Sequence, residues 1–359
     1  MLHQTRSLLA GLLLSLVLVG CSSAGLGRSK SLDPIDYVDP YMGNISHLLV
    51  PTFPTVHLPN GMMRVHPQRT DYASEQIAGL PVILTSHRGV SAFAISPLSA
   101  LSDSLPEVSR YSYDSESVRP YLYEVTLLEP EVRVRYAPSY RSAIYQFNFE
   151  RAKAGHHLVF STPDGELVAS GKNLFGYQQL EDSTRVYLYA EMDAEPTERL
   201  VRDTLTGRLA TVDGVARGNT LCLSFAKQGV TLRYGVSYIS VEQAKHNVER
   251  EIQSFEVNLV AKYGRNEWSK ALDKVEIEGG TPEERRVFYT SLYRTYERMI
   301  CLSEDGRYWS GFDKKVHDDE GVPFYTDDWL WDTYRATHPL RILLDPVKEQ
   351  QMLTSYLRM

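Results

Sequence analysis

The stretch YTDDWLWDTYRATHPL, at residues 325–340, gathers side chains that could do chemistry. It contains three Asp, two Trp, two Tyr, one Arg and one His. This composition suits three different structures: a wall that binds a sugar, a site that binds a metal, or a helix packed through its aromatic residues. The rest of the chain must decide among them.

A second acidic group lies in the polar segment before this stretch. Its members have the composition of a metal site: Asp313, His317, Asp318, Asp319 and Glu320. Their spacing does not place a set of ligands on one helix face, so we expect a solvated loop. No GxSxG, Walker or GxGxxG motif occurs in the chain, which leaves the first stretch as the main candidate.

The N-terminus has the pattern of an export signal. Arg6 precedes an apolar run from Leu8 to Val19 that is too short to span a bilayer comfortably, and Cys21 stands where a lipoprotein signal is cleaved. We therefore expect residues 1–21 to be a signal peptide with a lipidated Cys21, and residues 22–34 a flexible tether. This predicts a lipid-anchored protein of the bacterial cell envelope, periplasmic or at the outer membrane. A plain secretory signal is the alternative.

Composition narrows the class of protein. The chain has 359 residues, a formal net charge of −7 and 43% hydrophobic residues, which is typical of a globular protein large enough for two domains. It has no basic stripe, so we do not expect a nucleic-acid partner. Beyond Cys21, only Cys222 and Cys301 remain, and both a disulfide and two free thiols are possible.

Residues 35–240 have the pattern of β-strands. Alternation and β-branched or aromatic enrichment predict strands at 131–136, 143–149, 185–190 and 230–239, with turn signals between them. Because no helical period separates the strands, we expect an antiparallel β-sandwich.

The period changes after residue 240. Capping-box spacing at Ser240 and Thr281 predicts helices at 241–262 and 282–301; a short helix is expected near 266–274. One face of the helix at 282–301 is expected to carry Val287, Phe288, Ser291, Leu292 and Thr295. Residues 303–324 are expected to form a polar loop. A last helix begins near Pro346 and runs to the end of the sequence, so we expect the front part of a longer protein; a naturally short protein is the alternative.

Several motifs resemble those of one enzyme family. They are FYTSLYR at 288–294, DGRY at 305–308, LWDTYRATHPL at 330–340, VDPYMG at 38–43 and PNGM at 59–62. In order and spacing the chain resembles the N-terminal portion of a divergent member of glycoside hydrolase family 92, the calcium-dependent exo-α-mannosidases. The resemblance implies an α+β architecture: an N-terminal antiparallel β-sandwich at 35–240, linker helices at 241–280, and the first helices of an incomplete α/α toroid at 281–359.

The resemblance also implies an activity. Family members release non-reducing terminal α-linked mannose with inversion, and calcium holds vicinal hydroxyls of the sugar. Inversion needs a carboxylic acid and a second carboxylate that activates water. In the family both lie beyond the point that matches Met359, so no catalytic residue is expected within this chain, and the chain alone is predicted to be inactive. Its calcium ligands cannot be identified from the sequence.

Site residues follow from the same resemblance. Trp331 and Asp332 match the family's contacts to the terminal mannose, and Arg335 is expected to hold Asp332 from one helical turn away. The preceding Asp327, Asp328 and Trp329 are expected to be supporting groups.

The loops near the N-terminus depart from the family. Bulky residues replace the usual glycines at 43–51, and the segment 84–89 replaces a usual motif. Four side chains in or near these loops have two interpretations, as sugar contacts or as structural groups: His47, His57, His87 and Arg88. Two further functions therefore stay open: a non-catalytic carbohydrate-binding or vestigial lipoprotein, and an exo-glycosidase of altered specificity.

Overall fold

The computed structural model describes residues 32–45, 52–69, 74–86, 89–102, 105, 109–150, 155–181, 184–203 and 205–359. Residues Pro34–Met359 form one compact unit. The predicted signal peptide, Cys21 and most of the tether lie outside the described residues. Within the described ranges, the helices are all too short or too polar to cross a membrane.

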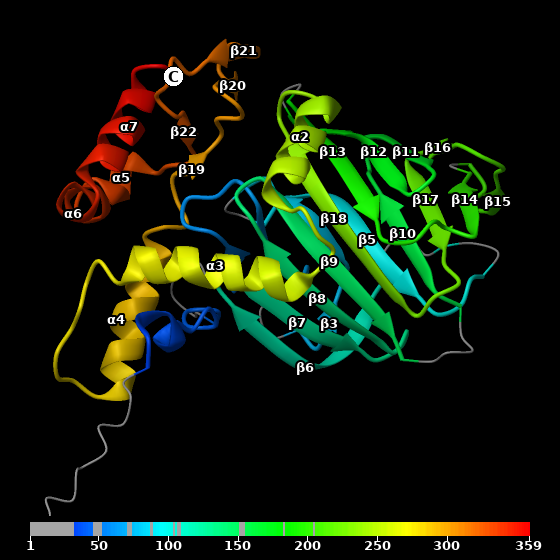
Figure 1. The fold of residues 1–359 in the computed structure, drawn as a ribbon, viewed down its shortest axis with the longest axis horizontal. Coiled ribbons are helices and arrows are strands. Elements are labelled where there is room, and N and C mark those ends of the chain that lie inside the picture. Colours follow the sequence, from blue (N-terminus) through cyan, green and yellow to red (C-terminus); the bar gives the residue numbers. More distant parts are fainter. Residues whose placement is uncertain are drawn as a thin grey trace, which may run out of the picture. The chain divides into compact units, whose positions relative to one another are not determined.

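Two antiparallel sheets form the first two thirds of the compact unit (Figure 1). In the described part of the chain, the larger sheet has ten strands in the order β16-β11-β12-β13-β18-β9-β8-β7-β6-β3. Their bounds are β3 (Gln76–Ile77), β6 (Tyr111–Arg119), β7 (Leu122–Leu127), β8 (Val132–Pro138), β9 (Ser142–Phe149), β11 (Gly165–Ser170), β12 (Asn173–Gln179), β13 (Arg185–Met192), β16 (Ala216–Gly218) and β18 (Gly229–Ser237).

The smaller sheet has the order β15-β14-β17-β10-β5-β4 among the described residues. Its strands are β4 (Leu80–Leu84), β5 (Ser91–Leu98), β10 (His157–Ser161), β14 (Glu198–Arg202), β15 (Leu209–Thr211) and β17 (Thr220–Ser224). The four strands predicted from alternation are confirmed as β8, β9, β13 and β18.

The space between the sheets is filled by aliphatic and aromatic side chains, and two tyrosines tie the sheets together. Tyr145 on β9 and Tyr234 on β18 are almost fully buried. Their hydroxyls donate to the carbonyls of Pro81 and Val82 on β4, at 2.9 and 2.7 Å. Each buried hydroxyl thus has a partner in the opposite sheet, which fixes how the sheets face each other.

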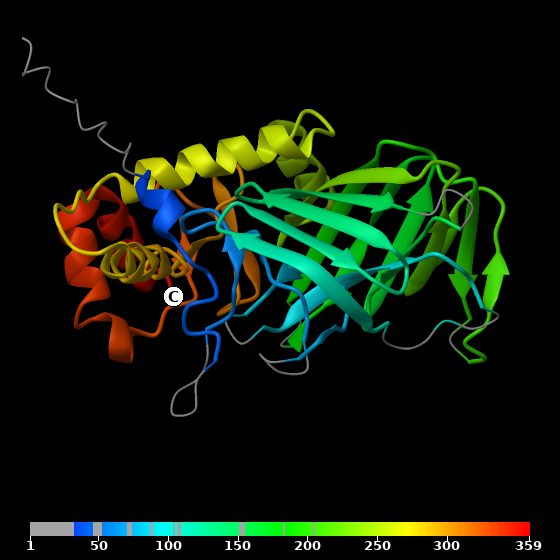
Figure 2. The same ribbon diagram turned by 90° about the horizontal axis from the view of Figure 1, so that it is seen from below.

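Two helices cover the outer face of the larger sheet (Figures 1 and 2). Helix α2 (Val241–Glu251) packs on β18, where a side chain at Gly235 would place its Cβ 2.1 Å from the Ala244 carbonyl. Helix α3 (Val257–Leu272) packs on β8 and β9. The helix predicted at 241–262 begins at Val241 as expected but ends at Glu251, and residues 257–272 form one second helix instead of a separate short one near 266–274. The chain becomes extended at Ile252, which is buried against the sheet, and Phe255 lies under the Arg233 guanidinium.

Helix α4 (Pro282–Arg294) begins with the predicted capping box, in which Thr281 and Glu284 bond reciprocally. It ends seven residues earlier than predicted. Of the predicted face, Leu292 is buried, but Val287 is 54% exposed, and Tyr289 and Tyr293 are buried instead. The packed face is aromatic because it meets the 3₁₀ turn η1 (Pro34–Tyr37) and the Trp268 ring of α3.

Residues 52–69, which we call the N-terminal segment, run between the sandwich and these helices. This segment contains the short strands β1 (Val56–His57) and β2 (Arg64–Val65). Tyr293 donates its hydroxyl to the Thr55 carbonyl at 2.6 Å, Trp268 donates to His57 O at 2.7 Å, and Asn60 donates to Met299 O at 2.9 Å. These buried bonds join residues more than 200 positions apart.

The last sixty residues form two small β-ladders and three helices. Strand β19 (Ile300–Cys301) pairs with β22 (Tyr325–Thr326), and β20 (Arg307–Ser310) pairs with β21 (Lys315–Asp318). The predicted polar loop at 303–324 thus contains a hairpin. Helices α5 (Leu330–Thr333), α6 (Thr337–Leu344) and α7 (Pro346–Tyr356) follow. A sandwich followed by helices is the predicted architecture, and it is confirmed.

Candidate functional site

The first part of the candidate site is the turn after β22, which is held against the sandwich by one ion pair. Asp327 has a positive φ of 65°, and its Oδ2 accepts from Arg64 Nη2 at 2.7 Å. Arg64, on β2, also donates through Nε to the Leu84 carbonyl at the end of β4. Because Arg64 is buried, it fixes this turn relative to both the N-terminal segment and the smaller sheet.

The one-turn helix α5 presents Trp331 and Asp332 to solvent. Trp331 is 70% exposed and Asp332 is exposed as well. The centroid of the Trp331 ring lies 5.6 Å from that of Trp329, and the two ring planes are tilted by 43°. The Arg298 guanidinium lies 5.2 Å from the Trp329 ring. An exposed indole beside an exposed carboxylate can cover the apolar face of a pyranose and accept hydrogen bonds from its hydroxyls.

The predicted contact between Arg335 and Asp332 is not formed. Helix α5 ends at Thr333, so no continuous helical turn connects the two residues. Arg335 instead donates through Nε to the Tyr334 hydroxyl at 3.0 Å, and its guanidinium lies over that ring. Arg335 is therefore not placed to orient the Asp332 carboxylate.

Beneath α5 lies a buried polar cluster that the motifs did not reveal. Asp328 Oδ2 accepts hydrogen bonds from Thr333, His338 and Tyr356. On its other side, His338 Nδ1 lies 2.5 Å from Glu349 Oε1. Burial of Asp328 acts against its charged form, but the bonds from Tyr356 and His338 outweigh it and lower the pKa of Asp328.

The histidines of the N-terminal segment are structural. His57 is buried against the rings of Trp268 and Tyr293, and its Nδ1 donates to the Leu58 carbonyl at 2.9 Å. His66 stacks on Phe53, with ring centroids 4.1 Å apart. Burial lowers the pKa of each to about 4, so both rings are neutral near pH 7. His47, His87 and Arg88 lie outside the described residues.

The expected calcium ion can be compared with the acidic groups of the described residues. Across the described residues, no group of three or more His, Cys, Asp or Glu is arranged to hold a metal. In the polar hairpin, Asp313 pairs with His317 at 2.9 Å instead. We therefore assign no calcium ligand to the described chain and route no chemical step through the ion.

A separate pocket of about 270 Å³ lies where the sandwich meets the last helices. Arg141, Cys301, Tyr325 and Lys348 line it, together with residues 59–62. Arg141 is already bound to Ser303 O and Glu251. Cys301 in this pocket and Cys222 in the sandwich are both free thiols. Neither Trp331 nor Asp332 lines this pocket. It is therefore distinct from the exposed surface that these two side chains form on α5, which we call the wall.

Two family models match the chain. The model of the glycosyl hydrolase family 92 N-terminal domain matches residues 37–237, and that of the family 92 catalytic domain matches residues 243–359. Among curated proteins, no sequence matches.

Solved structures of the same family are also similar. The GH92 inverting mannosidase BT2199 from Bacteroides thetaiotaomicron VPI-5482 has a TM-score of 0.79 and 27% identity, over 91% of this chain and 48% of that one. The GH92 α-mannosidase BT3965 from Bacteroides thetaiotaomicron has a TM-score of 0.78 and 22% identity, over 90% and 49%. BT3965 in complex with mannoimidazole gives a TM-score of 0.77, again at 22% identity and over 91% and 49% of the two chains.

The chain thus spans about half the length of the solved structures it matches. The N-terminal-domain model alone covers more than half of the chain, and the catalytic-domain model continues to Met359. The sandwich, the helices that follow it and the exposed wall on α5 all lie within these two matches, and the chain belongs to glycosyl hydrolase family 92.

Proposed function

We propose that this chain is the sandwich-bearing half of an exported glycoside hydrolase that releases non-reducing terminal α-linked mannose with inversion. The observation that carries the proposal is the pair of exposed side chains on α5, Trp331 and Asp332, inside the segment that matches the catalytic domain. The similarity to an inverting mannosidase supports the reaction type.

In this proposal the wall binds the sugar and the chemistry comes from elsewhere. The Trp331 ring stacks on the pyranose, and the Asp332 carboxylate accepts hydrogen bonds from two hydroxyls. Inversion then needs an acid and a base about 6.5–9.5 Å apart, with a water between the base and the sugar. We place both carboxylates in the half of the relatives' length that this chain does not span. Calcium belongs to the proposal only for that complete enzyme.

Binding by the purified chain tests the wall. Titration with methyl α-mannoside, followed through the indole resonance of Trp331, should saturate, and Asp332→Asn should weaken binding at least about tenfold, because a hydrogen bond to a charged group is lost. Trp331→Ala, followed by calorimetry, should do the same. Phe312→Ala removes another exposed aromatic residue, 62% exposed and on the β20–β21 hairpin, and should leave binding unchanged. Equal affinities in all variants would refute the wall.

Hydrolysis separates the enzyme from a binding protein. The chain alone should release no mannose from an α-mannobioside; measurable release would contradict the placement of the acid and base. A non-catalytic carbohydrate-binding lipoprotein is the second candidate, since an exposed indole beside an exposed carboxylate can bind a sugar without hydrolysing it. A product of the same gene that extends past Met359 and hydrolyses mannobiosides, with activity lost in a chelator, would exclude it.

The anchor is a separate part of the proposal. The pattern around Cys21 supports lipid attachment in the cell envelope. The wild-type protein should incorporate labelled palmitate and sediment with membranes, whereas Cys21→Ser should do neither. Labelling that persists in Cys21→Ser would show that the anchor is elsewhere.

A further inference from the structure

The buried cluster under α5 joins three elements of the last sixty residues. Asp328 comes from the turn after β22, His338 from α6, and Glu349 and Tyr356 from α7. The side chains of Asp328, His338 and Glu349 are 2%, 8% and 1% exposed. Such burial of ionisable groups is sustained only when they pair with one another.

The His338 ring joins the two acidic groups of the cluster. Its Nε2 lies 3.0 Å from Asp328 Oδ2, and its Nδ1 lies 2.5 Å from Glu349 Oε1. Arg341, with Nη1 4.0 Å from Glu349 Oε2, adds a cation. Both ring nitrogens are therefore engaged, and the ring holds Asp328 and Glu349 in one network.

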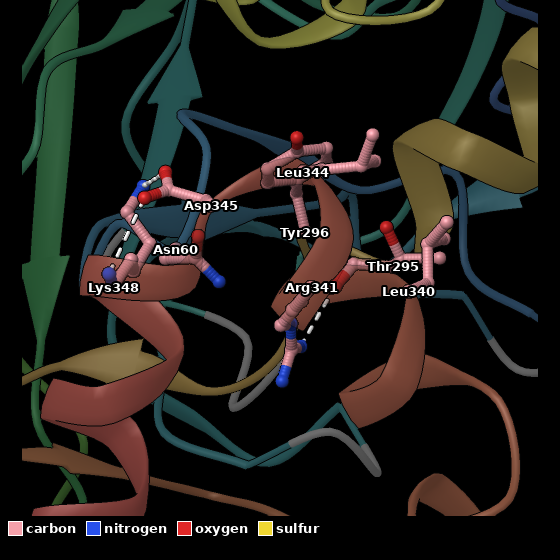
Figure 3. Close-up of a pocket in the computed structure, with 8 residues that line it drawn as sticks. All are labelled: Asn60, Thr295, Tyr296, Leu340, Arg341, Leu344, Asp345 and Lys348. Atoms are coloured by element: carbon pink, nitrogen blue, oxygen red, sulfur yellow. Dashed lines mark hydrogen bonds and ion pairs between the residues drawn. The ribbon is translucent and has the colours of Figure 1, made fainter.

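Arg341 also fixes the cluster to the preceding helix. Its Nη2 donates to the Thr295 carbonyl at the end of α4, at 2.9 Å (Figure 3). Leu340 and Leu344 of α6 line a small pocket with Tyr296 at the same place (Figure 3). The cluster therefore rests on a helix that itself packs on η1 and α3.

Helix α5 depends on this support, because it has no packing of its own. It has four residues, none of them buried. A helix this short is not stable by itself, so contacts from its flanking residues must fix its direction. The hydroxyl oxygen of Thr333, at its C-terminal end, lies 3.1 Å from both Asp328 Oδ2 and the Trp329 carbonyl oxygen, which share its single proton as acceptors. Asp328 precedes the helix, so this bond closes the turn that carries Trp331 and Asp332.

We infer that Asp328 is the positioning residue of the sugar-binding wall: held by His338 and Tyr356 of α6 and α7, it fixes α5 through Thr333. The wall is then presented only when α7 is docked. The sugar-binding role of the wall rests on the proposed function, but the fixing of α5 does not.

The test compares variants at both ends of the Asp328–Thr333 bond. Thr333→Val removes the hydroxyl at nearly constant volume, whereas Thr333→Ser keeps it. Amide hydrogen exchange at residues 332–334 should speed up about tenfold or more in Asp328→Asn, His338→Asn and Thr333→Val, as expected for loss of a hydrogen bond to a charged group. Thr333→Ser should restore slow exchange. Exchange in β8 and β9 should be unchanged in every variant that folds.

Two results would overturn the inference. One is unchanged exchange at 332–334 in folded Asp328→Asn and Thr333→Val. The other is equally fast exchange in Thr333→Ser and Thr333→Val, which would mean that the hydroxyl is irrelevant. The indole resonance of Trp331 gives a second readout, since it should move in Thr333→Val and return in Thr333→Ser. If exchange responds as expected but even the wild type does not bind methyl α-mannoside, the proposed function fails and the positioning role stands.

Discussion

Two neutral buried histidines should make this protein sensitive to mild acid. Burial lowers the pKa of His57 and of His66 to about 4, against an ordinary value near 6.5 in the unfolded chain. Between these two values the unfolded chain binds more protons than the folded one. The stability that depends on these two neutral histidines is therefore fully present above pH 6.5 and is lost as the pH falls toward 4. At pH 5 each histidine should cost about 2 kcal/mol, or about 4 kcal/mol together.

The measurement is urea unfolding of the purified chain at pH 7.5 and pH 5.0, followed by circular dichroism. His57→Asn and His66→Asn each keep an amide near the position of Nδ1, which donates to a backbone carbonyl in both residues. Each variant should lose roughly half of the pH-dependent difference, whatever its stability at pH 7.5. Exposed His246, 3.8 Å from Asp305, is the control, and His246→Asn should keep the full difference.

Other groups contribute alike in the wild type and in the variants. Burial raises the pKa of Glu304, so this group acts against the loss of stability in acid. Carboxylates with a lowered pKa, such as Asp328, contribute mainly below about pH 4. His157 has a pKa lowered by burial and leaves a residual effect in the double variant. A double variant that loses as much stability between pH 7.5 and 5.0 as the wild type would refute the reasoning, because the proton uptake would then come from groups other than His57 and His66.

Three further predictions concern packing and pairing. Gly235→Ala should lower the free energy of unfolding by about 2 kcal/mol or more in thermal unfolding, because its Cβ meets the backbone of α2. Gly311→Ala, where the Cβ enters open space, is the control and should be near neutral. Similar losses in the two variants would contradict the close approach at Gly235. Arg64→Met should cost about 2 kcal/mol, measured by urea unfolding, since it removes the ion pair to Asp327; a neutral result would mean that the pair is not structural. Tyr234→Phe should cost about 1 kcal/mol through its lost bond between the sheets, and no loss in calorimetry would exclude that role.

The sandwich was predictable because its strands carry their own period. Residues 185–192 alternate between buried and partly exposed positions along β13, and the same alternation is visible in the sequence. Strand order was not predictable, since pairings such as β16 with β11 join distant segments. The break between α2 and α3 was missed because Phe255 continued the apolar period, although its ring packs under Arg233 outside any helix.

The candidate site was only partly predictable. Trp331 and Asp332 belong to a motif, so they could be found in the sequence, and the structure leaves both exposed. The contact expected of Arg335 assumed a helix that in fact ends at Thr333. The Asp328–His338–Glu349 cluster had no signal, because its members are ten or more residues apart and meet only when α6 and α7 pack together. Tertiary contacts of this kind do not follow from local spacing.

The buried bonds of the N-terminal segment have a consequence for how the chain acquires its structure. The carbonyl groups of Thr55 and His57 accept hydrogen bonds from Tyr293 and Trp268, which lie more than 200 residues further along the chain. Contacts of such long range form slowly, because closing the large loop between them costs conformational entropy before the contacts can stabilise the fold. The two regions matched by the family models, which meet near residue 240, are therefore expected to fold as one cooperative unit. A sandwich cut there would keep its strands but lose the partners of its first segment, and we expect it to unfold locally at residues 52–60 and to aggregate through the uncovered face of β8 and β9.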